Sequence, residues 1–189
     1  MFVDSHCHLD RLDYEKVGEL STVLDSARNR GVEKFLCIAT HLDGYDRIAA
    51  IAKSHDDVRI TAGIHPLQKH VANVDADRLR VQVSQEKTVA VGETGLDYYY
   101  AADTAEAQRA SFATHVQIAV EANKPLVIHT RDAVADTLAI LKDNQADKCG
   151  GTLHCFTESL AMAEAALDIG FYISFSGILT FKSAEGSRL

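Results

Sequence analysis

Short apolar stretches alternate with longer amphipathic stretches along the whole chain. The apolar stretches predict strands at 1–4, 34–39, 59–65, 88–93, 125–130, 151–156 and 171–176. Between them, apolar residues spaced by three and four predict helices at 15–30, 45–52, 75–85, 104–122 and 159–168. A further helix is predicted with Asp132 as its N-cap and with Val134, Leu138 and Leu141 on its apolar face. This alternation is typical of an α/β protein with a parallel sheet.

The number of these units favours a barrel over an open sheet. Seven strands with six helices between them, in units of roughly 25–35 residues, fit a TIM (β/α)8-type barrel. Such a barrel typically runs to about 250 residues, whereas this chain has 189, and its stretch 186–189 has no strand character. We therefore expect one domain over residues 1–189, a TIM-type barrel that lacks the eighth strand and the helix after it.

Composition and charge narrow the functional classes. Hydrophobic residues make up 47% of the chain and charged residues 24%, as in ordinary globular proteins. The net charge of -8 argues against a broad basic surface for nucleic acid, so a bound phosphate would need local positive charge such as divalent metal ions. The chain shows no signal segment and no apolar run near the ~20 residues of a membrane span. We expect a soluble, cytoplasmic protein that does not contact a membrane.

The cysteines agree with a reducing compartment. They stand singly, without a C-x-x-C pair, which indicates reduced thiols rather than disulfides or a zinc–thiolate site. The four are Cys7, Cys37, Cys149 and Cys155.

Candidate metal ligands fall at the ends of the predicted strands. His6 and His8 follow the first strand at alternate positions, so both imidazoles face the same way, about 6–7 Å apart at Cα. Later strands end in His65, Glu93, His129 and His154. Parallel barrel strands end at one mouth, where active sites lie, so we expect these side chains to converge. The remaining histidines are expected to be structural: His41, His55, His70 and His115.

Glu93 is the candidate to bridge two metal ions and to be the catalytic carboxylate, because it offers two oxygens while a neutral imidazole offers one lone pair. We expect one ion on His6, His8 and Glu93. The second is expected on Glu93, His129 and His154. Nitrogen and oxygen ligands without thiolate fit Zn, Mn or Mg. Two ions about 3.5–4 Å apart activate water and stabilise both oxygens of a displacement at phosphorus, which predicts phosphoester hydrolysis.

Other polar residues near these candidates have two possible roles each. Arg131 could hold a substrate phosphate oxygen or pair with a carboxylate such as Asp132. Asp97 is expected to hold the Gly-rich turn after Glu93, with orientation of a ligand histidine as the alternative. The tyrosines at 98–100 could stack on bases, although packing against a helix is their expected role.

Five motifs resemble those of the TatD family of metal-dependent hydrolases and deoxyribonucleases. They are Val-Asp-Ser-His-Cys-His-Leu-Asp at 3–10, Gly-Ile-His-Pro at 63–66, Gly-Glu-Thr-Gly-Leu-Asp-Tyr-Tyr at 92–99, His-Thr-Arg-Asp at 129–132 and His-Cys-Phe at 154–156. The resemblance covers essentially the whole chain and implies a cytoplasmic TIM barrel with a two-metal site that cleaves DNA. It implies a substrate-side role for His65 and a set of metal ligands consisting of His6, His8, Glu93, His129 and His154.

The family pattern also has a catalytic, metal-ligating aspartate at the end of the eighth strand, and this sequence ends before it. A chain of this length is therefore expected to bind metal more readily than it turns over substrate. Two other hypotheses stay open. One is a metal-dependent hydrolase of a small ester or cyclic amide. The other is a non-catalytic remnant whose exposed edge strands pair with another subunit, and the oligomeric state is left open.

Overall fold

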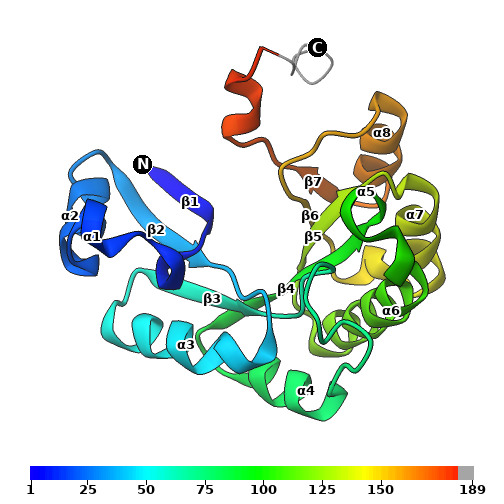
Figure 1. Ribbon diagram of the computed structural model, residues 1–189, viewed down its shortest axis with the longest axis horizontal. Helices are drawn as coiled ribbons and strands as arrows, with labels where there is room; N and C mark the ends of the chain where they lie inside the picture. Colours follow the sequence, from blue (N-terminus) through cyan, green and yellow to red (C-terminus); the bar gives the residue numbers. More distant parts are fainter. Residues whose placement is uncertain (183–189) are drawn as a thin grey trace.

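The computed structural model describes residues 1–182, in which strands and helices alternate (Figure 1). The strands are β1 (Phe2–Cys7), β2 (Val32–Cys37), β3 (Val58–Ala62), β4 (Thr88–Asp97), β5 (Leu126–Arg131), β6 (Gly151–Leu153) and β7 (Phe171–Ile173). They form one sheet in sequence order, and every neighbouring pair is parallel. The main helices are α2 (Leu20–Arg28), α3 (Tyr45–Ser54), α4 (Ala76–Ser84), α6 (Ala105–Ala122), α7 (Val134–Asp143) and α8 (Leu160–Asp168).

The sheet curls into a partial barrel with its helices on the outside (Figure 1). Its hydrogen-bonded order runs from β1 to β7 without a pairing between those two strands. The predicted TIM-type architecture, with seven parallel strands, is confirmed. The stretch 186–189, which was predicted to have no strand character, lies outside the described residues.

The core lies between the outer face of the sheet and the helices. The main helices contribute large apolar side chains that are fully buried there, among them Leu24, Ile48, Leu79, Phe112 and Leu141. The inner face of the sheet has its own small apolar cluster of Ile38, Ala90 and Val127. Within residues 1–182, no helix combines the length and apolar character needed to cross a bilayer.

Two predicted helix boundaries are wrong. The helix predicted at 15–30 is broken into α1 (Tyr14–Val17) and α2, because Gly18 has a φ of 81°, in the left-handed region that ends a helix. Asp132 is not an N-cap: its own φ is 53°, and α7 starts after Ala133. The backbone N–H of Asp132 instead donates to Glu158 Oε1 at 2.9 Å.

The ends of the strands also differ from the prediction, and this matters for the site. β4 continues to Asp97, with a register shift between Gly92 and Thr94 that sets Glu93 within the strand. β3 ends at Ala62, so His65 lies in the loop after it. Gly95 lies so close to β5 that an added Cβ would be 1.9 Å from the carbonyl oxygen of His129. Only glycine permits this approach, which brings the two strands together at the site.

Candidate metal centre

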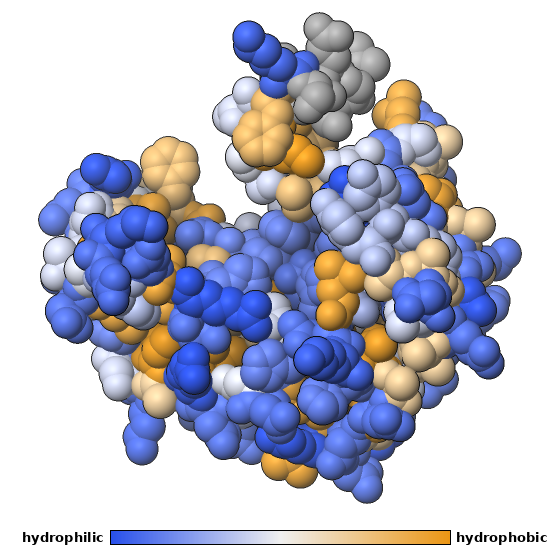
Figure 2. Space-filling model, viewed as in Figure 1, coloured by the Kyte–Doolittle hydropathy of each residue, from blue (hydrophilic) through white to orange (hydrophobic). Residues whose placement is uncertain are grey.

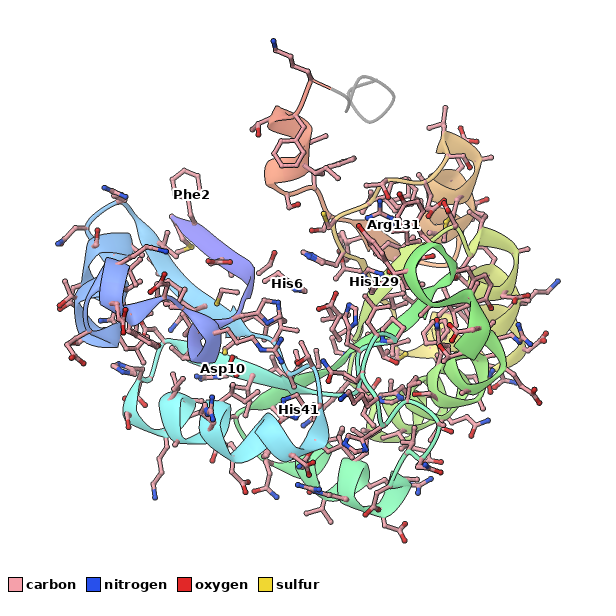
Figure 3. The ribbon with its side chains drawn as sticks, in the orientation of Figure 1. Phe2, His6, Asp10, His41, His129 and Arg131 are labelled. Atoms are coloured by element: carbon pink, nitrogen blue, oxygen red, sulfur yellow. The ribbon has the colours of Figure 1, made fainter. Side chains whose placement is uncertain are left out.

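The five predicted metal ligands and the predicted substrate-side histidine line one cavity of about 450 Å³ at the carboxyl ends of the strands. They come from β1, β4 and β5 and from the segments just after β1, β3 and β6, and they are His6, His8, His65, Glu93, His129 and His154. Figure 2 shows hydrophilic residues gathered in the hollow at the centre of this view. Figure 3 shows His6 and His129 facing this space from opposite sides. The predicted convergence of the strand ends is therefore present in the structure.

Glu93 lies at the centre of the cluster and is only 4% exposed. Its Oε2 is 3.4 Å from His6 Nε2, and its Oε1 is 3.7 Å from both His65 Nε2 and His129 Nδ1. Burial opposes ionisation of this carboxyl group, but the hydrogen bond from His6 and the charges of the neighbouring histidines outweigh it and lower the pKa of Glu93 to about 2. The side chain is therefore a carboxylate whose two oxygens face different histidines.

Among residues 1–182, two groups of side chains have ligand atoms within 4.8 Å of one another. One is His6, His8 and Glu93, and the other is His65, Glu93 and His129. The buried Nδ1 of His6 has no hydrogen-bond partner among the described residues, so this nitrogen is not satisfied by the protein itself. Imidazole nitrogens and carboxylate oxygens without a thiolate suit borderline divalent cations. The residues thus fit a metal centre.

Hydrogen bonds fix which nitrogen of two histidines can bind a cation. His8 Nδ1 lies 3.2 Å from the carbonyl oxygen of Ile38, to which it donates, so its Nε2 carries the free lone pair. His129 donates from Nε2 to Asp97 Oδ2 at 2.9 Å, which leaves its Nδ1 lone pair directed toward Glu93. Burial and the nearby His6 lower the pKa of His8, which keeps that imidazole neutral near pH 7. A carboxylate or carbonyl behind each ring is the arrangement usual for metal-binding histidines.

Asp97 therefore has both of the roles considered for it. Its side chain is fully buried, orients His129 through Oδ2, and accepts the backbone N–H of Tyr100 on Oδ1 at 2.8 Å, which holds the turn. Its backbone N–H donates to Gln108 Oε1 at 2.7 Å. Sequence reasoning missed Gln108; the only available signal was a polar residue among the apolar positions of the helix predicted at 104–122.

His65 presents a proton rather than a lone pair to the cavity. Its Nδ1 accepts the backbone N–H of Leu67 at 3.2 Å, so the neutral ring carries its hydrogen on Nε2, which faces Glu93. Burial, only partly offset by the nearby Glu93, lowers the pKa of His65 to about 4. This tautomer suits hydrogen bonding to an oxygen atom better than coordination.

His115, which was expected to be structural, holds the loop that carries His65. His115 is fully buried in α6, accepts the backbone N–H of Ile64 on Nε2 at 3.0 Å, and donates from Nδ1 to the carbonyl oxygen of Ser111 at 2.7 Å. Its structural role agrees with the expectation from the sequence, and its hydrogen bonds hold the segment just before His65.

His154 and Arg131 also line the cavity, with different contacts. The His154 ring stacks on His6, with centroids 3.3 Å apart and planes 7° apart, and burial followed by the nearby His6 lowers its pKa to about 4. It belongs to neither close group of ligand atoms, so its role on the second ion stays a prediction. Arg131 makes no ion pair with Asp132 within residues 1–182 and lies over the rings of Tyr99 and Tyr100.

Comparison with known proteins gives consistent results. A family model described as "TatD related DNase" matches residues 3–189. The chain is 50% identical over 187 residues to the Escherichia coli "uncharacterized metal-dependent hydrolase YcfH", covering 98% of this chain and 70% of that protein. It is 32% identical over 193 residues to the Mycobacterium tuberculosis "uncharacterized metal-dependent hydrolase TatD", covering 98% of this chain and 72% of that protein. The crystal structure of YjjV, a TatD homolog from Escherichia coli, superposes with a TM-score of 0.89 at 29% identity, covering 99% of this chain and 72% of the other.

Proposed function

This chain belongs to the family of TatD-related DNases, and from this premise we propose that it is a metal-dependent hydrolase that cleaves phosphodiester bonds of DNA through a two-metal site. The observation that carries the proposal is the buried carboxylate of Glu93, whose two oxygens face two sets of imidazoles in one cavity. The names of YcfH and of the mycobacterial TatD, both metal-dependent hydrolases, support the same class of reaction. The free thiols of all four cysteines fit the proposed cytoplasmic location.

We assign the first ion to His6, His8 and Glu93, and the second to Glu93, His129 and His154. The closeness of the first three ligand atoms and the free Nδ1 of His129 support this assignment. Two divalent ions bound there would supply Lewis-acid activation of water and of the phosphoryl oxygens.

The chain's own residues would bind and orient the phosphodiester. Glu93 stays ionised and would hold the two cations at the bottom of the cavity. Its burial strengthens the electrostatic attraction between the carboxylate and the cations. His65 Nε2–H is directed to donate to a non-bridging phosphate oxygen, and Arg131 at the rim offers a fork of N–H donors to a second phosphate. These local groups would attract the phosphodiester, which the general surface of a chain of net charge -8 would not attract.

A panel of substrates tests the proposed function. Protein stripped of metal and reloaded with Mn²⁺, Zn²⁺ or Mg²⁺ is assayed on a labelled DNA oligonucleotide, on p-nitrophenyl acetate and on a cyclic amide. We expect metal-dependent cleavage of the DNA, abolished by Glu93→Gln. Turnover of only the ester or the amide would favour the alternative hydrolase. Metal binding without any turnover, together with self-association in light scattering, would favour a non-catalytic assembly protein.

A further inference from the structure

Three consecutive tyrosines follow β4, in the short helix α5 (Tyr98–Ala101), and they have different environments. The hydroxyl of Tyr98 donates to Asp136 Oδ2 at 2.6 Å and is part of the packed structure. The side chains of Tyr99 and Tyr100 are exposed, by 58% and 65%, with their rings edge to face and centroids 4.7 Å apart. Two adjacent exposed aromatic rings contribute little to the core, so the fold gives no reason for them.

Both rings contact a guanidinium group at the rim of the metal cavity. The central carbon of the Arg131 guanidinium lies 4.4 Å from the centroid of Tyr99 and 5.0 Å from that of Tyr100. Within residues 1–182, no carboxylate forms an ion pair with Arg131; the charge of its guanidinium interacts with the two rings and, at longer range, with Glu158. A stacked guanidinium keeps its N–H groups, which lie in its own plane, available to an anion.

The register of the sheet connects this pair of rings to the metal centre. Arg131 and His129 are alternate residues of β5 and so share one face of the sheet, and Arg131 pairs in register with Asp97. Asp97 orients His129 and also accepts the backbone N–H of Tyr100. Figure 3 shows Arg131 beside His129 at the edge of the same space. One buried carboxylate therefore contacts both the proposed metal ligand His129 and the backbone of Tyr100, and the strand register sets Arg131 beside them.

We propose that Tyr99, Tyr100 and Arg131 form a binding subsite for the nucleotide next to the scissile phosphodiester. The Arg131 guanidinium binds the phosphate of that nucleotide, and an exposed tyrosine ring stacks on its base. This inference rests on the proposed function and adds a substrate-binding element to it. A base can stack on the ring only when it is outside a duplex, so the subsite takes an unpaired nucleotide.

Two substrates separate this subsite from the catalytic centre. The Tyr99→Leu/Tyr100→Leu double variant keeps apolar volume but removes both rings, and Tyr172→Leu is the matched control, an exposed tyrosine at the opposite end of the strands. Loss of base stacking should raise KM for a DNA oligonucleotide on the order of 10- to 100-fold, with kcat nearly unchanged. The kcat/KM for methyl p-nitrophenyl phosphate, which has no base, should stay within about twofold of wild type. Arg131→Gln should raise KM for the oligonucleotide, and Arg131→Lys should restore it only in part.

Abasic DNA provides the stricter test. Removing the base beside the cleaved bond should raise the KM of wild type as much as the double tyrosine substitution does. In the double variant, the same removal should raise KM hardly any further. Equal losses from the abasic site in both proteins would overturn the proposal. If wild type cleaves neither phosphodiester, the proposed function fails, and binding of a labelled oligonucleotide in EDTA then decides the subsite alone. Unchanged anisotropy titrations of the double variant and Arg131→Gln would overturn it.

Discussion

The two ends of the inner face of the sheet differ in chemistry although the same strands build both. At the carboxyl ends, a cavity of about 450 Å³ is lined by histidines and Glu93. At the amino ends, a hollow of about 390 Å³ is lined mainly by small and apolar residues such as Leu36, Ala90 and Val127. On β5 the change occurs over three alternate residues of one face, from Val127 through His129 to Arg131. On β5, therefore, one end of the strand supplies packing and the other end supplies chemistry.

This difference has an energetic side. The carboxyl end concentrates a buried carboxylate and several imidazoles, an arrangement that is costly to bury without a partner. The amino end has mainly apolar side chains, which favour folding. A cation that binds only the folded protein would raise the free energy of unfolding and so offset this cost. Substitutions at the two ends should therefore separate cleanly into effects on metal binding and effects on folding.

The largest effect is expected from Glu93→Gln. The amide keeps the shape of the side chain but removes the charge that faces both sets of histidines, so divalent metal affinity should fall by roughly 1,000-fold or more. Isothermal titration with Zn²⁺ or Mn²⁺ measures this. Glu121→Gln, an exposed carboxylate paired with Arg80, is the control and should bind metal like wild type. Equal affinity in the two variants would remove Glu93 from the site.

A pH effect of about 3 kcal/mol on stability is expected from His115, a buried histidine away from the metal ligands. Burial lowers its pKa from 6.5 to about 4 in the folded protein. Between these values the unfolded chain binds the proton and the folded one does not, so this contribution is present above pH 6.5 and is lost as pH falls toward 4. Urea unfolding of wild type and His115→Gln at several pH values measures it. Parallel pH curves for the two proteins would contradict the assignment.

Asp97→Asn should weaken metal binding without removing a ligand. The amide can still accept the N–H of Tyr100, but it no longer fixes His129 with Nδ1 free, so affinity should fall about 10- to 100-fold. Titration calorimetry checks this, with Asp136→Asn as control because Asp136 bonds Tyr98 and Arg109 instead. If Asp136→Asn lost as much metal affinity as Asp97→Asn, a local orienting role for Asp97 would be wrong.

The smallest effect is a change in the free energy of unfolding at Val127, and it is compared with a substitution of His129 on the same strand. Val127→Ala removes two buried methyl groups at the amino end and should lower the free energy of unfolding by about 1–2 kcal/mol, with metal affinity unchanged. His129→Gln, two residues away on the same face, keeps an N–H that can donate to the buried carboxylate of Asp97 but removes the imidazole, so it should lose metal affinity with little loss of stability in the metal-free protein. Denaturation in EDTA and metal titration of both variants test this contrast. A loss of metal affinity in Val127→Ala would contradict the separation of the two ends.

Periodicity and strand ends made most of the fold and much of the site predictable. Alternation of strands and helices was enough for the barrel type, and the motif resemblance is confirmed by the family match. The break at Gly18 was missed because apolar spacing continues across it, and only its positive φ ends α1. The left-handed conformation of Asp132 was also missed, since an Asp before a helical pattern is usually its N-cap.

Within the site, the sequence could indicate which residues converge but not which atoms face which. The proton position of His65 depends on the backbone N–H of Leu67, and the orientation of His129 depends on Asp97, contacts that residue type does not encode. The stacking of His154 on His6 brings together a residue of β1 and one that follows β6, far apart in the sequence. Such details depend on register, and β4 shifts register at Glu93.

Anomalous X-ray diffraction from crystals grown with Mn²⁺ or Zn²⁺ would show whether Glu93 holds two cations. We expect two anomalous peaks in the cavity, one between His6, His8 and Glu93 and the other between Glu93, His129 and His154, with Glu93 contacting both. A cavity without peaks under saturating metal, or metal bound only elsewhere on the protein, would contradict the proposed two-metal site.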